Sequence, residues 1–253
     1  MQSGLKDRFA ARWHQYFPGA DLPISFYYAQ EPGTAERVNP PAGGHRCLMA
    51  DIAKVRRGES LALDIHSIGC FGGKRYLGFD QGLMPNFEYF LSCGIPGAME
   101  GERYKKTPEL VRELVAKAPK FVAPAPFIVF KRWDHLTEAD EPEVVIFFAP
   151  PDVLSGLFTL SGFDEADLNG VVAPFGAGCG TIVEYPYLER DSPRPRSILG
   201  MFDVSARPFV EPGVLSFAVP MAKFERMVGH MAESFLITPS WAKVRKRIEQ
   251  LGG

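Results

Sequence analysis

The sequence lacks any long uninterrupted apolar segment, which argues against a membrane-spanning helix. Such a helix needs roughly 20 consecutive apolar residues, and the most apolar stretch, residues 143–154, is interrupted by Pro150, Pro151 and Asp152. Residues 1–17 are charged and amphipathic, and they show neither the apolar run nor the small-residue cleavage site of a secretory signal. We therefore predict a cytoplasmic protein without a membrane partner.

The sequence also lacks an excess of basic charge, since 28 lysine and arginine residues face 30 acidic ones and the net charge is -2. The densest basic run, residues 243–247, falls on a predicted helix, where a solvated face is the ordinary explanation. We predict no nucleic-acid partner. A chain of 253 residues with 46% hydrophobic and 23% charged residues fits one large globular core, and we predict a single domain over residues 1–253.

Cysteine is scarce, and its spacing matches no familiar metal motif. The four cysteines are separated by 23, 23 and 86 positions, whereas zinc ribbons, ferredoxins and thioredoxins use C-x-x-C pairs. A reducing compartment also excludes a disulfide framework for so few cysteines in so long a chain. The alternatives that remain are buried thiols, metal ligands and a catalytic nucleophile.

What is present is a mixture of helical and strand patterns that do not alternate strictly. This favours an α+β fold with a mixed, largely antiparallel sheet packed against helices. The patterns predict helices at residues 5–17, 47–57, 107–118, 150–160, 224–235 and 238–251. They predict strands at residues 23–29, 61–69, 75–79, 126–130, 143–148, 197–206 and 213–220, and a strand, a turn and a second strand within residues 170–188.

Three of the cysteines lie where backbone N–H groups are exposed by glycine or by the start of a helix. Cys47 begins a predicted helix, Cys70 precedes a glycine pair in a predicted turn between strands, and Cys179 lies inside the glycine-rich turn 176–180. N–H groups directed at sulfur stabilise the thiolate, which is the form that binds metal or attacks an electrophile. Cys93 follows an apolar run, and for it we predict packing in the core.

Glycine-rich turns can also bind an anion directly, because successive N–H groups form an anion nest. The candidate binding residues are Gly72, Gly73, Gly178 and Gly180. Neither a P-loop lysine nor the dinucleotide pattern G-x-G-x-x-G opening a helix is present, so the sequence predicts no nucleotide.

Two further side chains are candidates for chemistry near these turns. His66 stands four residues before Cys70 and is a candidate base or ligand, although a lone histidine is more often a surface residue. A buried Arg207 would need an anionic partner, either Asp203 in the same turn or a carboxylate or phosphate of a ligand.

Several segments together form a specific pattern over most of the chain: residues 47–58, 70–73, 77–79, 143–157, 176–179, 200–207, 215–220 and 233–236. In this pattern the sequence resembles the uncharacterised family called domain of unknown function 169. That family carries Ser-Gly-Cys where this chain has Ala177, Gly178 and Cys179, so the serine hydroxyl is missing here. The resemblance implies a cytoplasmic protein of bacteria or archaea without an established activity, and it singles out Cys47, Cys70 and Cys179 over Cys93.

Three functional hypotheses follow. In the first, Cys47, Cys70 and Cys179 hold a metal or an iron–sulfur cluster with an open position. In the second, Cys179 is the nucleophile of an enzyme and His66 is its base. In the third, the glycine turns and Arg207 bind a small anionic or aromatic molecule without catalysis. The sequence leaves the oligomeric state open.

Overall fold

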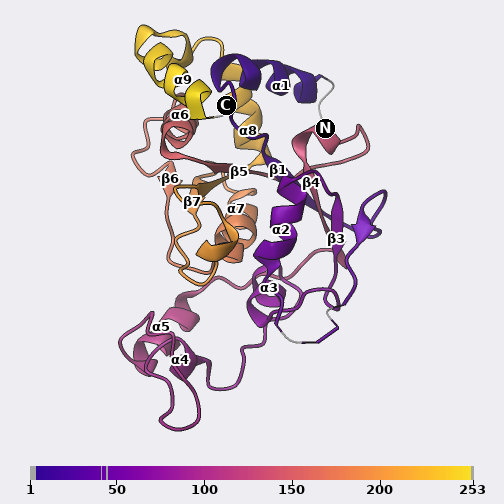
Figure 1. Ribbon diagram of the computed structural model, residues 1–253, viewed down its shortest axis with the longest axis vertical. Helices are drawn as coiled ribbons and strands as arrows, with labels where there is room; N and C mark the ends of the chain where they lie inside the picture. The colour runs from indigo at the N-terminus through magenta and orange to yellow at the C-terminus, as the bar shows by residue number, and fades with distance from the viewer. Residues whose placement is uncertain (1–3, 41, 44, 252–253) are drawn as a thin grey trace.

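An eight-stranded sheet with the order β2-β3-β4-β1-β5-β8-β7-β6 forms the centre of the computed structural model, which describes residues 4–40, 42–43 and 45–251 (Figure 1). The pairs β2·β3 and β6·β7 at the two edges are parallel, and the other pairs are antiparallel. The prediction of an α+β fold with a mixed, largely antiparallel sheet is therefore confirmed. The strands are β1 (Ile24–Ala29), β2 (Glu36–Arg37), β3 (Leu61–Leu63), β4 (Phe127–Arg132), β5 (Val144–Ala149), β6 (Val171–Val172), β7 (Ser197–Gly200) and β8 (Leu215–Pro220).

Strand β5 shows why the sheet has helices on both faces. All six of its residues are buried, and they alternate between two separate hydrophobic clusters because successive side chains of a strand point to opposite faces. Val144, Ile146 and Phe148 belong to one cluster, and the residues between them belong to the other. A continuous apolar run is what a strand buried on both faces requires.

One face of the sheet is covered by four helices, three of which carry buried aromatic rings. They are α1 (Leu5–Tyr16), α6 (Pro151–Ser161), α8 (Met221–His230) and α9 (Pro239–Leu251), which lie together at one end of the molecule in Figure 1. At the centre of this layer Phe9 stacks on Trp13, and Phe147 packs edge-on against Phe9 and at a tilt against Trp13. The stacking explains the aromatic spacing in the first predicted helix, which is confirmed.

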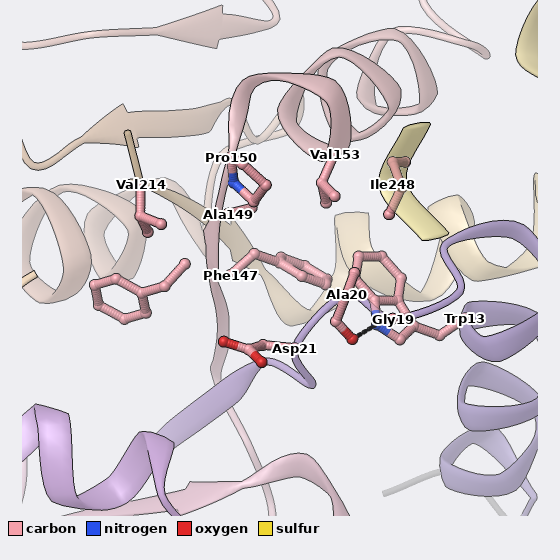
Figure 2. Close-up of a pocket in the computed structure, with 11 residues that line it drawn as sticks. Trp13, Gly19, Ala20, Asp21, Phe147, Ala149, Pro150, Val153, Val214 and Ile248 are labelled. Atoms are coloured by element: carbon pink, nitrogen blue, oxygen red, sulfur yellow. Dashed lines mark hydrogen bonds between the residues drawn. The ribbon is translucent and has the colours of Figure 1, made fainter. Parts of the chain in front are cut away.

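A cavity of about 270 Å³ opens where this layer meets the end of β5. Figure 2 shows Trp13, Phe147, Val153 and Ile248 around it, with Asp21 at its rim. Apart from Asp21 the side chains are apolar, and none of the four cysteines lines this cavity. The cavity is therefore separate from the site that the cysteines form.

The opposite face is covered by α2 (Leu48–Arg56), α3 (Phe71–Tyr76), a π-helical segment (Gly180–Glu184, hereafter the π segment) and α7 (Tyr185–Glu189). Two of these elements correct the sequence prediction. Residues 75–79 were expected to form a strand, yet Cys70 accepts a hydrogen bond from the Gly73 backbone N–H at 3.2 Å and starts α3. The second strand expected within residues 170–188 is also helical, because burial of its apolar side chains outweighs strand propensity.

Two predicted strands are shorter than their patterns suggested. The strand expected over residues 61–69 ends at Leu63, because the Asp64 carboxylate accepts hydrogen bonds from the next turn at the His66 and Ser67 backbone N–H groups. The strand expected over 197–206 ends at Gly200, because Met201 adopts a left-handed φ of 66°.

Helices α4 (Phe87–Phe90) and α5 (Pro108–Lys117) extend away from the sheet in Figure 1. The predicted start of α5 is confirmed, since the Thr107 hydroxyl accepts from the Leu110 backbone N–H and Pro108 occupies the first turn. Cys93 lies between these helices and is exposed, so the prediction of core packing for it was wrong. No helix in the described part of the chain has the length and apolar character needed to cross a membrane.

Candidate functional site

Cys47, Cys70 and Cys179 each lie at the beginning of a helical element on the same face of the sheet. Cys47 is the N-cap of α2 and Cys70 is the N-cap of α3. Cys179 lies in the first turn of the helical run 178–189, which contains the π segment and α7. All three pack against one hydrophobic cluster, so chain segments far apart in the sequence bring them into one neighbourhood.

The loops that carry Cys47 and Cys70 are joined through their backbones. The Arg46 N–H donates to the Gly69 carbonyl at 3.4 Å. A Cβ on Gly69 would lie only 2.8 Å from the Arg46 Cβ, so glycine is needed for this approach. The two cysteines that follow these residues are thereby fixed as neighbours.

The pKa of Cys179 shows that it lies close enough to Cys47 and Cys70 to be affected by their charges. Burial is the largest cause that raises the pKa of the Cys179 thiol, and the charges of Cys70, Cys47 and Asp203 raise it further. The pKa of Cys47 is raised by burial first, and then by Cys70 and Asp203 among other acids. The described residues contain no set of three or more histidine, cysteine, aspartate or glutamate side chains arranged to hold a metal ion. The thiols are thus neighbours without being in a ligating arrangement.

The expectation that backbone N–H groups keep these sulfurs ionised is wrong for two of them. The N–H groups of Met49 and Gly180 do lower the pKa values of Cys47 and Cys179, respectively, but burial has the larger and opposite effect. Both thiols are therefore neutral at pH 7.

The Cys70 sulfur accepts a hydrogen bond from the Gly73 backbone N–H. A Cβ at Gly73 would lie 2.8 Å from that sulfur, so glycine is required there.

The Asp203 carboxylate accepts one N–H group of the glycine-rich turn. Its Oδ2 accepts from the Gly178 backbone N–H at 2.9 Å, and its Oδ1 accepts from the Ser205 backbone N–H at 3.1 Å and the Ser205 hydroxyl at 2.8 Å. The chain supplies its own carboxylate at the beginning of the Cys179 helix, where the helix dipole favours negative charge. The predicted roles of Gly178 and Gly180 in binding an external anion remain predictions.

Asp203→Asn is expected to make Cys47 more reactive, because it removes one of the negative charges that raise the pKa of this thiol. We expect the alkylation rate of Cys47 by iodoacetamide at pH 8 to rise roughly threefold, as the loss of a single screened charge would produce. Mass spectrometry of the labelled peptide measures this rate. Asp152→Asn is the control, because Asp152 pairs with Arg247 on the other face. An unchanged or slower alkylation rate in Asp203→Asn would contradict the conclusion that the Asp203 charge raises the pKa of Cys47.

Arg207 does not pair with the Asp203 carboxylate. Its guanidinium donates to three backbone carbonyls, those of Val214 at 2.5 Å, Glu211 at 3.4 Å and Met201 at 3.5 Å. The partners are thus peptide oxygens of the loop that carries Asp203, and the expected ion pair is absent. A role for Arg207 in binding a ligand remains a prediction.

His66 lies exposed in the turn after β3, and no hydrogen bond joins its ring to a cysteine among the described residues. Its role as a base or ligand is still a prediction. Gly72 lies in α3, where a Cβ would only reach ordinary contact with the Tyr76 ring at 3.8 Å. At Gly180 the same ring lies 3.0 Å from the Cβ position, so glycine lets α3 pack closely on the π segment.

Glu184, the last residue of the π segment, is a residue that sequence reasoning missed. It is 3% exposed, and no hydrogen bond or ion pair to its carboxyl group occurs within the part of the chain that the structure describes. Burial raises its pKa to about 7, against the opposing charge of Arg75. The available signal was a single acid in the otherwise uncharged stretch 176–188.

Pro186 accounts for the unusual winding that positions Glu184. Proline lacks an N–H group and clashes with the carbonyl four residues earlier in an α-helix. The preceding turn widens instead, and the Tyr185 N–H donates to the Gly180 carbonyl five residues back. Such π turns occur mostly as single turns and often at functional sites.

A family model matches most of the chain. The model of the family DUF169, described as "Uncharacterised ArCR", matches residues 22–230. This span includes Cys47, Cys70, Cys179, Glu184 and Asp203. No curated protein and no solved structure matches the chain.

Proposed function

The chain belongs to the uncharacterised family DUF169, and from this premise we propose that it binds a thiophilic metal centre, most specifically an iron–sulfur cluster, through Cys47, Cys70 and Cys179. The observation that carries the proposal is the gathering of three thiols at three helix beginnings in one neighbourhood. Cysteine sulfur is a soft ligand, and soft ligands select zinc, copper(I) and iron–sulfur clusters.

The electrostatics of the site favour a cation. Negative charge on Cys47, Cys70 and Asp203 raises the pKa of Cys179, which means that the thiols would repel one another and Asp203 if they were ionised. A bound cation removes that mutual repulsion, because metal binding replaces the thiol protons and neutralises the thiolates. The beginnings of the surrounding helices supply N–H dipoles that favour negative sulfur.

Binding requires the sulfurs to turn toward a common centre, since they are not arranged as ligands in the described residues. Cys47 and Cys70 are half-buried, so we expect their side chains to reorient with little disturbance of the core. Three thiolates leave one position of a tetrahedral ion, or one iron of a cluster, for a small-molecule ligand. Free thiols suit a reducing compartment, and the cytoplasm is the location we propose.

The alternative of a Cys179 nucleophile receives less support. Cys179 is 9% exposed and its pKa is raised well above the ordinary value, whereas a reactive cysteine is typically accessible and has a depressed pKa. The alternative of a small-anion binding module is weakened by Asp203, whose carboxylate already accepts the Gly178 N–H.

The proposal is tested by metal analysis and an absorption spectrum of the full chain purified without oxygen and reconstituted with iron and sulfide. We expect a brown protein with one metal centre per chain. Cys179→Ser is expected to weaken binding by about 100-fold or more, since loss of a direct ligand exceeds the 10–100-fold typical of an outer-shell change.

Cys93→Ser is the matched control, because Cys93 is exposed in the α4–α5 segment away from the other three cysteines. It is expected to bind as the wild type does. Colourless wild-type protein that takes up neither iron nor zinc would refute the proposal, as would equal loss in the Cys93 and Cys179 variants.

A further inference from the structure

The cavity at the end of β5 takes its walls from both hydrophobic layers of the protein. Trp13, Phe147 and Ile248 belong to the layer that α1, α6, α8 and α9 form. Phe148 belongs to the layer on the opposite face of the sheet, and Val214 packs against that layer. Figure 2 shows Val214 on the opposite side of the cavity from Trp13 and Ile248. The cavity therefore runs across the end of the strand from one layer to the other.

The walls of the cavity are buried, whereas its mouth faces solvent. Trp13, Phe147 and Val153 are each at most 3% exposed. Gly19 and Asp21, which also line the cavity, lie in the loop between α1 and β1 and are exposed. A small molecule can therefore enter past this loop without displacing a helix.

Contacts among the lining residues and their neighbours fix the shape of the cavity. The Trp13 indole N–H donates to the Ala20 carbonyl at 3.2 Å, and the Trp13 ring stacks on Phe17 with the centroids 4.3 Å apart. On the other side, Pro150 and Pro151 begin α6, and a proline ring fixes the φ angle of its residue. Walls held in this way are typical of ligand sites, which are mostly apolar and largely preformed.

The volume and the walls of the cavity indicate the size and the kind of molecule that fits. An engineered apolar cavity of about 150 Å³ in another protein binds benzene, and the cavity here has a volume of about 270 Å³. The difference leaves room for a second fused ring. The rings of Trp13, Phe147 and Phe148 line the cavity, and aromatic rings pack favourably edge-on or offset against one another. A bicyclic aromatic molecule matches both properties.

The charges at the mouth are paired with one another. The Arg56 guanidinium lies 4.8 Å from the centroid of the Phe148 ring. Its Nη1 lies 2.7 Å from a carboxylate oxygen of Glu211, and its Nη2 lies 3.5 Å from one of Asp21. A charged ligand has to compete with these pairs and to bring its charge among apolar walls, which is costly. The ligand that fits is therefore uncharged.

We propose that the cavity at the end of β5 binds an uncharged bicyclic aromatic molecule of the size of indole. The rings of the ligand contact the aromatic walls, and binding removes apolar surface of both partners from water. This inference does not depend on the proposed metal centre, because none of the four cysteines is among the described residues that line the cavity.

Titration of the metal-free full chain with indole, followed by NMR of labelled valine and isoleucine methyl groups, tests the proposal. We expect saturable shifts of the methyl signals of Val153, Val214 and Ile248, which line the cavity. The expected Kd is about 0.1–1 mM, a range typical of so small a ligand. Val129 belongs to a separate cluster at β4, and its signals are expected to stay unchanged. An absence of saturable shifts up to the solubility limit of indole would overturn the proposal, as would equal shifts at Val129.

Val153→Phe places a ring inside the cavity and is expected to weaken indole binding by about tenfold or more, since two ring systems overpack the site. Ala20→Leu narrows the mouth from a half-exposed position and tests the same point if Val153→Phe does not fold. Val122→Phe is the matched control, because Val122 is 72% exposed and does not line the cavity. Unchanged binding in both cavity variants, or an equal loss in the control, would overturn the proposal.

Two charged relatives of indole test whether the ligand is uncharged. Tryptamine carries an ammonium group and indole-3-acetate a carboxylate, and both are expected to bind more weakly than indole because the charges at the mouth are paired. Tighter binding of either relative than of indole would overturn the inference of an uncharged ligand.

Discussion

Replacing Glu184 by glutamine is expected to raise the free energy of unfolding by about 3 kcal/mol at pH 8, and by less than about 1 kcal/mol at pH 5. The folded chain raises the pKa of Glu184 from 4.5 to about 7, so the folded state binds the proton more tightly than the unfolded state does. The wild type therefore loses stability as the pH climbs from about 4.5 to about 7, and the penalty stays constant above pH 7. Glutamine never ionises, and it escapes this penalty.

Urea denaturation of both proteins at pH 5, 6, 7 and 8 measures the difference directly. Other groups titrate alike in the two proteins, so their contributions cancel in the difference between the curves. Glu113→Gln serves as the control, since its carboxylate is exposed and paired with Lys117, and no gain at pH 8 is expected. A Glu184 variant that is less stable than the wild type at pH 8 would show that the carboxylate has a partner when ionised.

Replacing Gly200 by alanine is expected to destabilise the protein by about 2–3 kcal/mol. It is also expected to disturb the packing around Cys179. Gly200 ends β7 and lies under the helical run that carries Cys179 and Glu184. An added Cβ would lie 2.5 Å from the Thr181 Cβ and 2.8 Å from the Ser216 Oγ. Both neighbours belong to packed elements, so the helical run has to move away from the sheet.

Gly229→Ala is a matched control for Gly200→Ala, because Gly229 lies in α8 and a Cβ there meets nothing within 4 Å. Alanine is the better helix former, so this change is expected to stabilise the protein by about 0.5–1 kcal/mol. Thermal unfolding measures both effects, and labelling of Cys179 by N-ethylmaleimide is expected to speed up in Gly200→Ala alone. Equal stability of the Gly200 variant and the wild type would contradict the prediction, because it would show that Thr181 and Ser216 can move to accommodate the added methyl group.

The elements that could be predicted from the sequence are those whose local pattern agrees with their final environment. The run Val144–Ala149 is apolar at every position and is buried on both faces. Thr107 and Pro108 begin α5 with the residues that helix beginnings prefer. The sequence also indicated the three cysteines of interest, because glycine or a helix beginning stands beside each one.

The errors occurred where contacts across the fold outweigh local preference. Residues 181–188 contain β-branched and aromatic side chains typical of strands, yet Ile182, Val183 and Tyr187 are buried as parts of a helical run. Glu184 could not be recognised as a buried acid, since its exposure depends on α3 and β1, which come from much earlier in the chain. The neutral state of Cys47 and Cys179 was missed for the same reason, because desolvation depends on the complete core.

The three cysteines Cys47, Cys70 and Cys179 can come together only late in translation, because the sheet that carries them pairs early strands with late ones. β1 emerges first but pairs with β4 and β5 in the middle of the sheet, and β8 joins that sheet only near the end of synthesis. A nascent chain therefore exposes Cys47 and Cys70 long before Cys179 and Asp203 exist. If the chain binds metal as proposed, binding is expected only after Cys179 has been synthesised, because a chain truncated before Cys179 contains two of the three proposed ligands.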